Sequence, residues 1–126
     1  MTSKSSARPR ESPARIPGVA TAEGTARFEA RFAERYADDF YRALGREGVR
    51  VSSVGLGSYL GECDAATDDG YLETVRAALE HGVNLLDTAI NYRCQRSERS
   101  MGRALARAID AGTVARDEVV VCTKGG

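Results

Sequence analysis

Aromatic side chains recur at every fourth position in the first third of the chain, with charged residues between them. The four positions are Phe28, Phe32, Tyr36 and Phe40. This spacing predicts a helix over residues 25–41 that carries the rings on one face. Such a stripe either packs within its own domain or offers a protein partner a docking surface through residues 25–40. Packing within the domain is favoured, because aromatic stripes usually belong to a core.

Three short apolar runs follow, at residues 51–57, 83–87 and 119–124. The segments between them, residues 67–82 and 97–112, carry apolar side chains at helical spacing. Because strands and helices alternate, the pattern predicts a βαβαβ unit with a parallel sheet. The last run is almost continuously apolar, which is typical of a strand covered on both faces.

Polar residues and glycines mark the ends of the predicted helices. Thr67 or Asp68 is the expected N-cap of the first helix, and Gly82 is its expected left-handed stop. Gly112 stands just past the end of the second helix. These signals make the βαβαβ interpretation consistent along its whole length.

Two architectures use such a repeat, the doubly wound sheet and the eight-stranded βα barrel. The first strand-to-helix turn runs from Gly55 to Gly61 as GxGxxxG, which misses the dinucleotide-binding GxGxxG spacing by one residue. Residues suited to catalysis stand just past the ends of the strands, where barrel enzymes place their active sites. The sequence therefore favours an α/β fold, the N-terminal part of a (β/α)8 TIM barrel with about three βα units and an N-terminal extension.

The chain divides into three predicted parts. Residues 1–24 contain all three prolines with scattered Ser, Arg and Gly, and are expected to be a disordered extension. Residues 25–50 are expected to hold the first helix and a hairpin. Residues 51–126 are expected to hold three strands and two helices of a truncated barrel.

Composition narrows the possible partners. The chain has 126 residues, a formal net charge of zero and a pI near 6.6. This balance indicates neither a nucleic-acid partner nor an anionic membrane. No apolar run approaches the roughly 20 residues that span a bilayer, and the first residues lack the apolar core of a secretory signal. A cytoplasmic protein is expected.

The cysteines are three in number, Cys63, Cys94 and Cys122. Their wide spacing matches neither a zinc site nor a disulfide framework, so no metal site is predicted and reduced thiols are expected. Cys94 follows Tyr92 closely, and an incidental loop position is favoured over a reactive thiol. Cys122 is expected to be a small core residue of the third strand.

A carboxylate, a phenol and an ammonium stand at two of the predicted strand ends, namely Asp87, Tyr92 and Lys124. Neighbouring strands lie about 5 Å apart, so the acid and the amine can pair across them. An adjacent ammonium makes a phenol a better acid, because it favours the phenolate. The trio therefore predicts a tyrosine that protonates a carbonyl oxygen while hydride reaches the carbon.

The segment Asp87-Thr-Ala-Ile-Asn-Tyr92 and the later Thr123-Lys124-Gly-Gly resemble the aldo-keto reductase superfamily, over roughly residues 40–126. The resemblance implies a (β/α)8 barrel that binds a nicotinamide cofactor, usually NADPH with NADH possible, and reduces a small-molecule aldehyde or ketone. It implies Tyr92 as proton donor, Lys124 as the residue that activates it, and Asp87 as the partner that orients the lysine.

The resemblance also extends to the first strand and to the segment before it. Gly57 and Ser58, together with Asp87, match the family's stretch beside the nicotinamide ribose. Residues 40–51 resemble the hairpin that closes the floor of the barrel. The phosphate-binding half of the family's barrel has no counterpart in this sequence.

The family's catalytic set includes a histidine on a later strand, and His81 does not match it, because it precedes the stop at Gly82. The expectation is therefore an N-terminal fragment of a longer enzyme, inactive and marginally stable by itself. Two alternatives stay open: a non-catalytic scaffold or regulatory subunit of the same fold, and a degenerate remnant.

Overall fold

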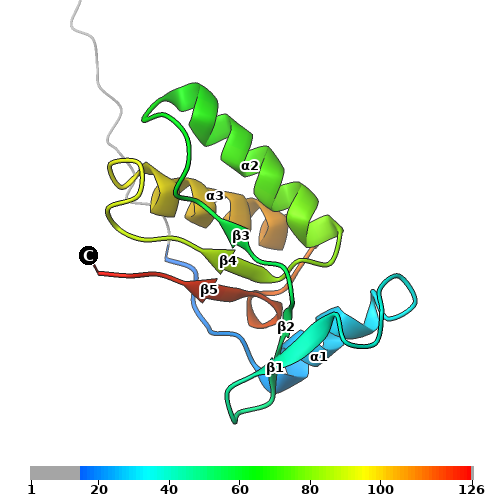
Figure 1. Ribbon diagram of the computed structural model, residues 1–126. Helices are drawn as coiled ribbons and strands as arrows, with labels where there is room; N and C mark the ends of the chain where they lie inside the picture. Colours follow the sequence, from blue (N-terminus) through cyan, green and yellow to red (C-terminus); the bar gives the residue numbers. More distant parts are fainter. Residues whose placement is uncertain (1–14, 126) are drawn as a thin grey trace, which may run out of the picture.

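The computed structural model describes residues 15–125 of the chain (Figure 1). Three α-helices, five short strands and one 3-10 turn follow one another within these residues. In order they are α1 (Ala22–Ala30), β1 (Tyr41–Leu44), β2 (Val49–Ser52), β3 (Leu56–Gly57), α2 (Ala65–Glu80), β4 (Leu85–Asp87), α3 (Arg96–Asp110), η1 (Arg116–Glu118) and β5 (Val120–Cys122).

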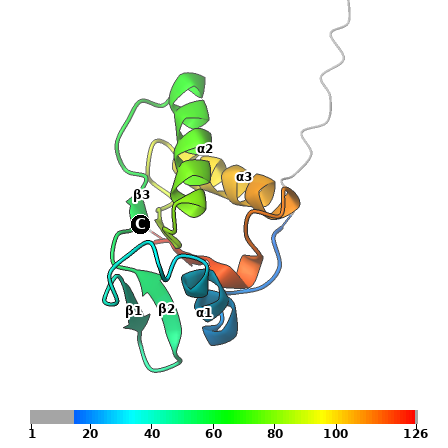
Figure 2. The ribbon, with the colours of Figure 1, turned by 90° about the vertical axis from the view of Figure 1, so that its right-hand side faces the viewer.

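The central feature is a three-stranded parallel sheet in the order β3-β4-β5. Leu56 pairs with Leu86, and Leu86 pairs with Val121 in the next strand. Helices α2 and α3 lie together on one side of this sheet (Figures 1 and 2). The described residues thus form the predicted α/β arrangement of successive βα units, with an open sheet and no closed barrel.

The core lies between this sheet and the two helices. Its members come from β4, from the inner faces of α2 and α3, and from the segment before β5. Those with almost no exposed surface include Val75, Leu79, Leu86, Met101 and Val119. The predicted helix stops are also present, because Gly82 and Gly112 both have left-handed backbone angles, with φ of 91° and 74°.

The predicted helix over residues 25–41 is wrong in its length. Helix α1 ends at Ala30, and residues 31–36 continue as tight turns instead. Long-range hydrogen bonds explain the change of path: the hydroxyl of Tyr36 donates to the carbonyl of His81, and that of Tyr41 donates to Gly82 at 2.6 Å. These bonds hold the chain beneath the end of α2, which a continued helix could not reach.

The four aromatic residues nevertheless pack within their own domain, as the favoured interpretation had it. Phe28 is fully buried, and Phe32, Tyr36 and Phe40 pack against the same core. The rings of Tyr36 and Phe40 stack with centroids 4.0 Å apart, and the Phe28 and Phe32 centroids are 5.0 Å apart. The aromatic residues at every fourth position therefore form a compact cluster and do not lie along one helical face.

The predicted strand over residues 51–57 is divided between two sheets. Val51 and Ser52 end β2, which pairs with β1 in an antiparallel hairpin, whereas Leu56 and Gly57 form β3 of the parallel sheet. The hairpin and α1 lie beyond the amino-terminal ends of the parallel strands, opposite the end of the chain (Figure 1). A hairpin thus forms within residues 41–52, and its role in closing a barrel floor stays a prediction.

Residues 15–24 also differ from the predicted disorder, while residues 1–14 lie outside the described part. Ile16 packs against the core, and Thr21 caps α1 by accepting a hydrogen bond from the Gly24 amide at 2.9 Å. The Thr21 amide donates to the carbonyl of Asp117 at 3.0 Å. These contacts fix the segment in spite of its polar composition.

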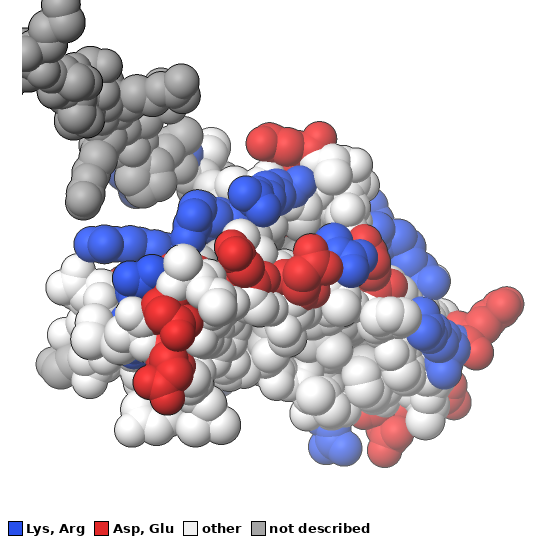
Figure 3. All heavy atoms as spheres, turned by 90° about the horizontal axis from the view of Figure 1, so that it is seen from above, with Lys and Arg blue, Asp and Glu red and all other residues white. Residues whose placement is uncertain are grey.

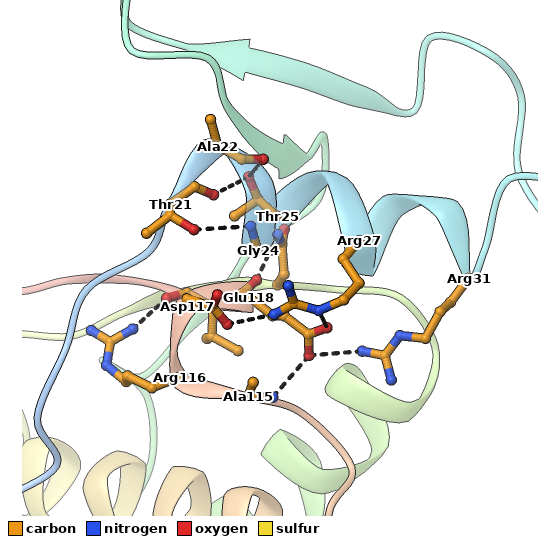
Figure 4. Close-up of polar contacts among 12 residues, drawn as sticks. Thr21, Ala22, Gly24, Thr25, Arg27, Arg31, Ala115, Arg116, Asp117 and Glu118 are labelled. Carbon is orange, nitrogen blue, oxygen red and sulfur yellow. Dashed lines mark hydrogen bonds and ion pairs between the residues drawn. The ribbon is translucent and has the colours of Figure 1, made fainter.

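Ion pairs fasten α1 to η1 (Figure 4). Arg27 pairs with Asp117 at 2.6 Å and with Glu118 at 3.1 Å, and Arg31 reaches the other oxygen of Glu118 at 3.1 Å. The Glu118 side chain is almost entirely buried, so its two arginine partners compensate for a charge removed from water. These ion pairs thus connect helix α1 to the turn that immediately precedes β5.

Two further predictions need correction. Asp64, not Thr67 or Asp68, caps α2, because its carboxylate accepts a hydrogen bond from the Thr67 amide at 2.8 Å. Cys122 is exposed, because it ends β5, which has a partner on one side only among the described residues. Asp68 instead has a role in the loop that follows β4, described below.

The surface charges are mixed on the face seen from above, where basic and acidic side chains lie side by side (Figure 3). On α2, Arg76 pairs with both Glu73 and Glu80, at 3.0 and 2.7 Å. Within residues 15–125, no helix has the length and apolar character needed to cross a membrane.

Candidate active site

The carboxyl ends of the three parallel strands lie in register. Gly57 pairs with Asp87, and Asp87 pairs with Cys122. The segments that leave these positions therefore emerge from one edge of the sheet, near the end of the chain in Figure 1. Two backbone hydrogen bonds extend the pairing of the last two strands, from Thr88 to Cys122 at 2.9 Å and from Ile90 to Lys124 at 3.1 Å.

Lys124 and Asp87 form an ion pair at this edge. The Lys124 ammonium donates to Oδ1 of Asp87 at 2.7 Å and to the carbonyl of Thr88 at 2.9 Å. Both side chains are about half exposed. The hydrogen bond to Asp87 is the main reason that the pKa of Lys124 is raised, with a smaller contribution from Tyr92, so the lysine is charged at neutral pH.

Tyr92 lies beside this pair. The Lys124 ammonium is 5.0 Å from the centroid of the Tyr92 ring. The Tyr92 amide donates to the carbonyl of Ala89 at 3.2 Å, which folds the loop back towards the strand. The ring of Tyr59 meets that of Tyr92 nearly at a right angle, with centroids 5.1 Å apart. The structure thus brings all three members of the predicted trio together.

Gly57 and Ser58 differ in what they present at this edge. Gly57 is exposed, and a Cβ built on it would have open space around it. Ser58 is fully buried: its hydroxyl donates to the carbonyl of Asp87 at 2.9 Å, and its own carbonyl accepts from the Ser97 hydroxyl at 2.5 Å. The Ser58 hydroxyl therefore links β3 to β4 and is not free for a ligand.

The residues that shape the loop carrying Tyr92 are not evident from the sequence. Three successive non-glycine residues, Arg93, Cys94 and Gln95, have positive φ angles of 49°, 55° and 69°. Such a run is unusual for residues with a Cβ and requires strong tertiary contacts. No feature of the sequence marks this turn in advance.

Arg93 and Arg96 supply those contacts by converging on Asp68 of α2. Arg93 pairs with Asp68 at 2.7 Å and is almost fully buried, while Arg96 reaches the second carboxylate oxygen at 2.7 Å. These bonds, that to Arg96 foremost, lower the pKa of Asp68 to about 2. Arg93 also donates to the carbonyl of Glu62 at 2.9 Å and lies over the ring of Tyr71. The loop after β4 is therefore fastened to the loop after β3.

A largely apolar hollow of about 610 Å³ opens between β3 and the start of α2. Tyr59, Leu60 and Tyr71 contribute its larger side chains, and Gly57 lies at its edge. Tyr59 and Leu60 are among the most exposed large hydrophobic side chains of the described residues. The hollow adjoins Gly57, whereas Tyr92 does not line it.

Comparison with known proteins identifies relatives for this part of the chain. The sequence pattern of the Aldo/keto reductase family matches residues 53–126. Aldo-keto reductase YhdN from Bacillus subtilis (strain 168) is 36% identical over 87 residues, which are 67% of this chain and 25% of the relative. L-galactose dehydrogenase from Arabidopsis thaliana is 39% identical over 87 residues, 68% of this chain and 26% of the relative. The chain thus spans about a quarter of these relatives.

Proposed function

Because the chain belongs to the aldo/keto reductase family, we propose that the whole protein reduces an aldehyde or ketone to an alcohol with hydride from NADPH or NADH. The observation that carries this proposal is the Lys124–Asp87 pair at 2.7 Å, with the Tyr92 ring 5.0 Å from the same ammonium. In this proposal the three βα units are the first part of a (β/α)8 barrel, and the protein acts in the cytoplasm.

Tyr92 is the proposed proton donor. As the carbonyl oxygen gains negative charge, the Tyr92 hydroxyl transfers its proton to that oxygen. The phenolate that forms is stabilised by the Lys124 ammonium beside the ring. The reaction therefore begins and ends with Lys124 charged, which agrees with the raised pKa of this residue.

Asp87 is the proposed positioning residue for Lys124. Its carboxylate and the Thr88 carbonyl hold the ammonium from two directions, at 2.7 and 2.9 Å. A lysine side chain has several rotatable bonds, so two fixed acceptors reduce the number of positions that the charge can take. The ammonium is in this way kept near the phenol.

The residues at this edge fit the ribose part of a nicotinamide cofactor. The open space at Gly57 lets a ligand approach the backbone closely, and the half-exposed carboxylate of Asp87 is an acceptor for a sugar hydroxyl. Ser58 contributes its backbone position, since its hydroxyl is already bonded to Asp87. When bound, the cofactor supplies the hydride.

The proposal is tested with the full-length protein and a panel of small aldehydes and ketones. Oxidation of NADPH, and separately of NADH, is followed by the loss of absorbance of the reduced nicotinamide. Carbonyl-dependent oxidation, with an alcohol formed in equal amount, supports the proposal. Tight binding of the reduced cofactor with no turnover of any carbonyl would favour the non-catalytic scaffold instead.

A further inference from the structure

Two cysteine thiols meet beside the candidate active site although they are 31 residues apart in the chain. The sulfur atoms of Cys63 and Cys94 lie 3.1 Å apart, and both side chains are exposed. Cys63 stands in the loop between β3 and α2, and Cys94 in the loop between β4 and α3. The pair therefore bridges the two loops that carry Tyr59 and Tyr92.

The backbone on both sides of each thiol is held in place. The Arg93 guanidinium donates to the carbonyl of Glu62 at 2.9 Å and to that of Asp64 at 3.4 Å, the two residues that flank Cys63. Arg93 itself precedes Cys94, and its salt bridge to Asp68 anchors it at 2.7 Å. The approach of the two sulfurs thus follows from a buried ion pair and not from loose surface side chains.

The hydrogen bond between the two thiols makes them unequal. The Cys63 thiol donates a hydrogen bond to the sulfur of Cys94, and this bond is the main reason that the pKa of Cys63 is raised. Arg93 and Arg96 act on Cys63 in the opposite direction. Cationic neighbours of this kind favour thiolates and their reaction with oxidants.

We propose that Cys63 and Cys94 form a reversible dithiol–disulfide pair that a peroxide oxidises. The Cys94 thiolate attacks one peroxide oxygen and becomes a sulfenic acid, while the other oxygen leaves and is protonated. The Cys63 sulfur then attacks the Cys94 sulfur, and the sulfenic hydroxyl leaves as water with the Cys63 proton. Two thiols lose two electrons in total, and the peroxide is reduced by two.

The disulfide requires only a small movement. A disulfide bond is about 2.05 Å long, so the sulfurs must approach by roughly 1 Å from their present separation. The cross-link would join the loop of Tyr59 to the loop of Tyr92, whose rings already touch at a centroid distance of 5.1 Å. Oxidation would therefore displace the proton donor relative to Lys124.

The site is tested on the full-length protein, reduced, freed of reductant and treated with a small excess of hydrogen peroxide. Remaining thiols are alkylated, and the monomer from a non-reducing gel is digested with trypsin. Cleavage at arginine releases Cys63 in peptide 51–76 and Cys94 in the tripeptide 94–96. We expect these two peptides to be joined, and to separate on reduction.

Matched variants identify the partners. Cys122→Ser removes the third cysteine, also exposed, and should leave the cross-link intact. Cys63→Ser should abolish it and drive Cys94 to higher oxidised acids. Recovery of Cys63 and Cys94 of the wild type as alkylated thiols or separate acids, or a cross-link to Cys122, would overturn the proposal.

The effect of oxidation on turnover rests on the proposed reductase function, whereas formation of the cross-link does not. A failure of the cross-link can therefore be distinguished from a failure of the reductase function. A displacement of about 1 Å can cost up to about 100-fold in rate. We expect kcat/KM for a carbonyl substrate to fall by up to about that factor on oxidation of the wild type and of Cys122→Ser, and to recover with a dithiol. An unchanged kcat/KM in cross-linked protein would overturn this effect on the reaction.

Discussion

The Lys124 ammonium lies 2.7 Å from the Asp87 carboxylate, across two neighbouring parallel strands and 37 positions apart in the chain. The pairing depends on strand register, because Asp87 is opposite Cys122 and Lys124 follows two residues later. A shift of one residue in either strand would turn one of the two side chains to the other face of the sheet. The Lys124–Asp87 ion pair beside Tyr92 therefore depends on the register of β4 and β5.

Asp87→Asn should move the alkaline limit of the reaction. The hydrogen bond that Lys124 donates to the Asp87 carboxylate is the largest cause of the raised pKa of Lys124, so its loss lowers that pKa. The ammonium is then lost at a lower pH, and the fall of kcat at alkaline pH should begin earlier than in the wild type. The full pH profile of kcat with saturating cofactor checks this, and an unmoved or upward-shifted limit would contradict it.

Asp68→Asn should remove part of the acid sensitivity of the protein. The folded pKa of Asp68 is about 2, below the unfolded value of about 3.9. Its stabilising contribution is present above pH 4 and is lost as pH falls towards 2, an effect of about 1–2 kcal/mol. Urea unfolding of both proteins at pH 5 and pH 3 measures it.

The wild type should lose more stability than the variant between pH 5 and pH 3, because only the wild type has a carboxylate at position 68 to protonate. The variant should be the less stable protein at pH 5, since it leaves the buried Arg93 without its anionic partner. Equal losses in the two proteins would show that Asp68 does not carry this sensitivity.

Much of the fold follows from local signals in the sequence. The strand-helix alternation and the stops at Gly82 and Gly112 depend on side-chain spacing and backbone freedom alone. Helix α1 was predicted too long because the aromatic spacing does not reveal the bonds from Tyr36 and Tyr41 to the end of α2. Tertiary contacts there override a helical pattern.

In the candidate site too, some features can be predicted from the sequence and others cannot. Asp87, Tyr92 and Lys124 could be named from the sequence because they stand at or shortly after strand ends, and parallel strands bring those ends together. The Cys63–Cys94 contact and the role of Asp68 could not, since both depend on the path of two irregular loops. Only the folded chain shows that Arg93 joins these loops.

Gly24→Ala should destabilise the protein even though alanine is the better helix former. A Cβ at Gly24 would stand 2.6 Å from the carbonyl carbon of Asp117, which is backbone and cannot turn aside. We expect a loss of about 1–3 kcal/mol from this overlap. Gly70→Ala is the matched control, because Gly70 lies within α2 with nothing within 4 Å of its Cβ position.

The control should be more stable than the wild type by about 0.5–1 kcal/mol, through helix propensity alone. Urea unfolding of the three proteins measures both effects. A stabilising Gly24→Ala would mean that α1 does not pack as closely on η1 as the structure shows.

Asn84→Ala should be among the most destabilising single changes outside the apolar core. Asn84 is fully buried, and its amide donates to the carbonyls of Arg50 and Glu118, at 3.0 and 3.1 Å. Its side-chain oxygen accepts from the Ser52 amide at 2.9 Å. The side chain thus joins the hairpin, β4 and η1, and its loss leaves three backbone groups, two of them buried, without this partner.

We expect a loss of about 2–4 kcal/mol in the free energy of unfolding. Asn91→Ala is the control, because Asn91 is exposed and should change stability by less than about 0.5 kcal/mol. Thermal unfolding of the two variants under one set of conditions compares them. Similar values for both would contradict the structural role of Asn84.

Proton donation by Tyr92 in carbonyl reduction is best tested by comparing Tyr92→Phe with Tyr59→Phe in the full-length protein. Each variant loses one hydroxyl, and the two rings are in contact at the same edge of the sheet. We expect Tyr92→Phe to bind reduced cofactor normally and to lose about 100-fold or more in kcat, whereas Tyr59→Phe should stay within a few-fold of the wild type. Wild-type turnover in Tyr92→Phe would contradict proton donation by Tyr92.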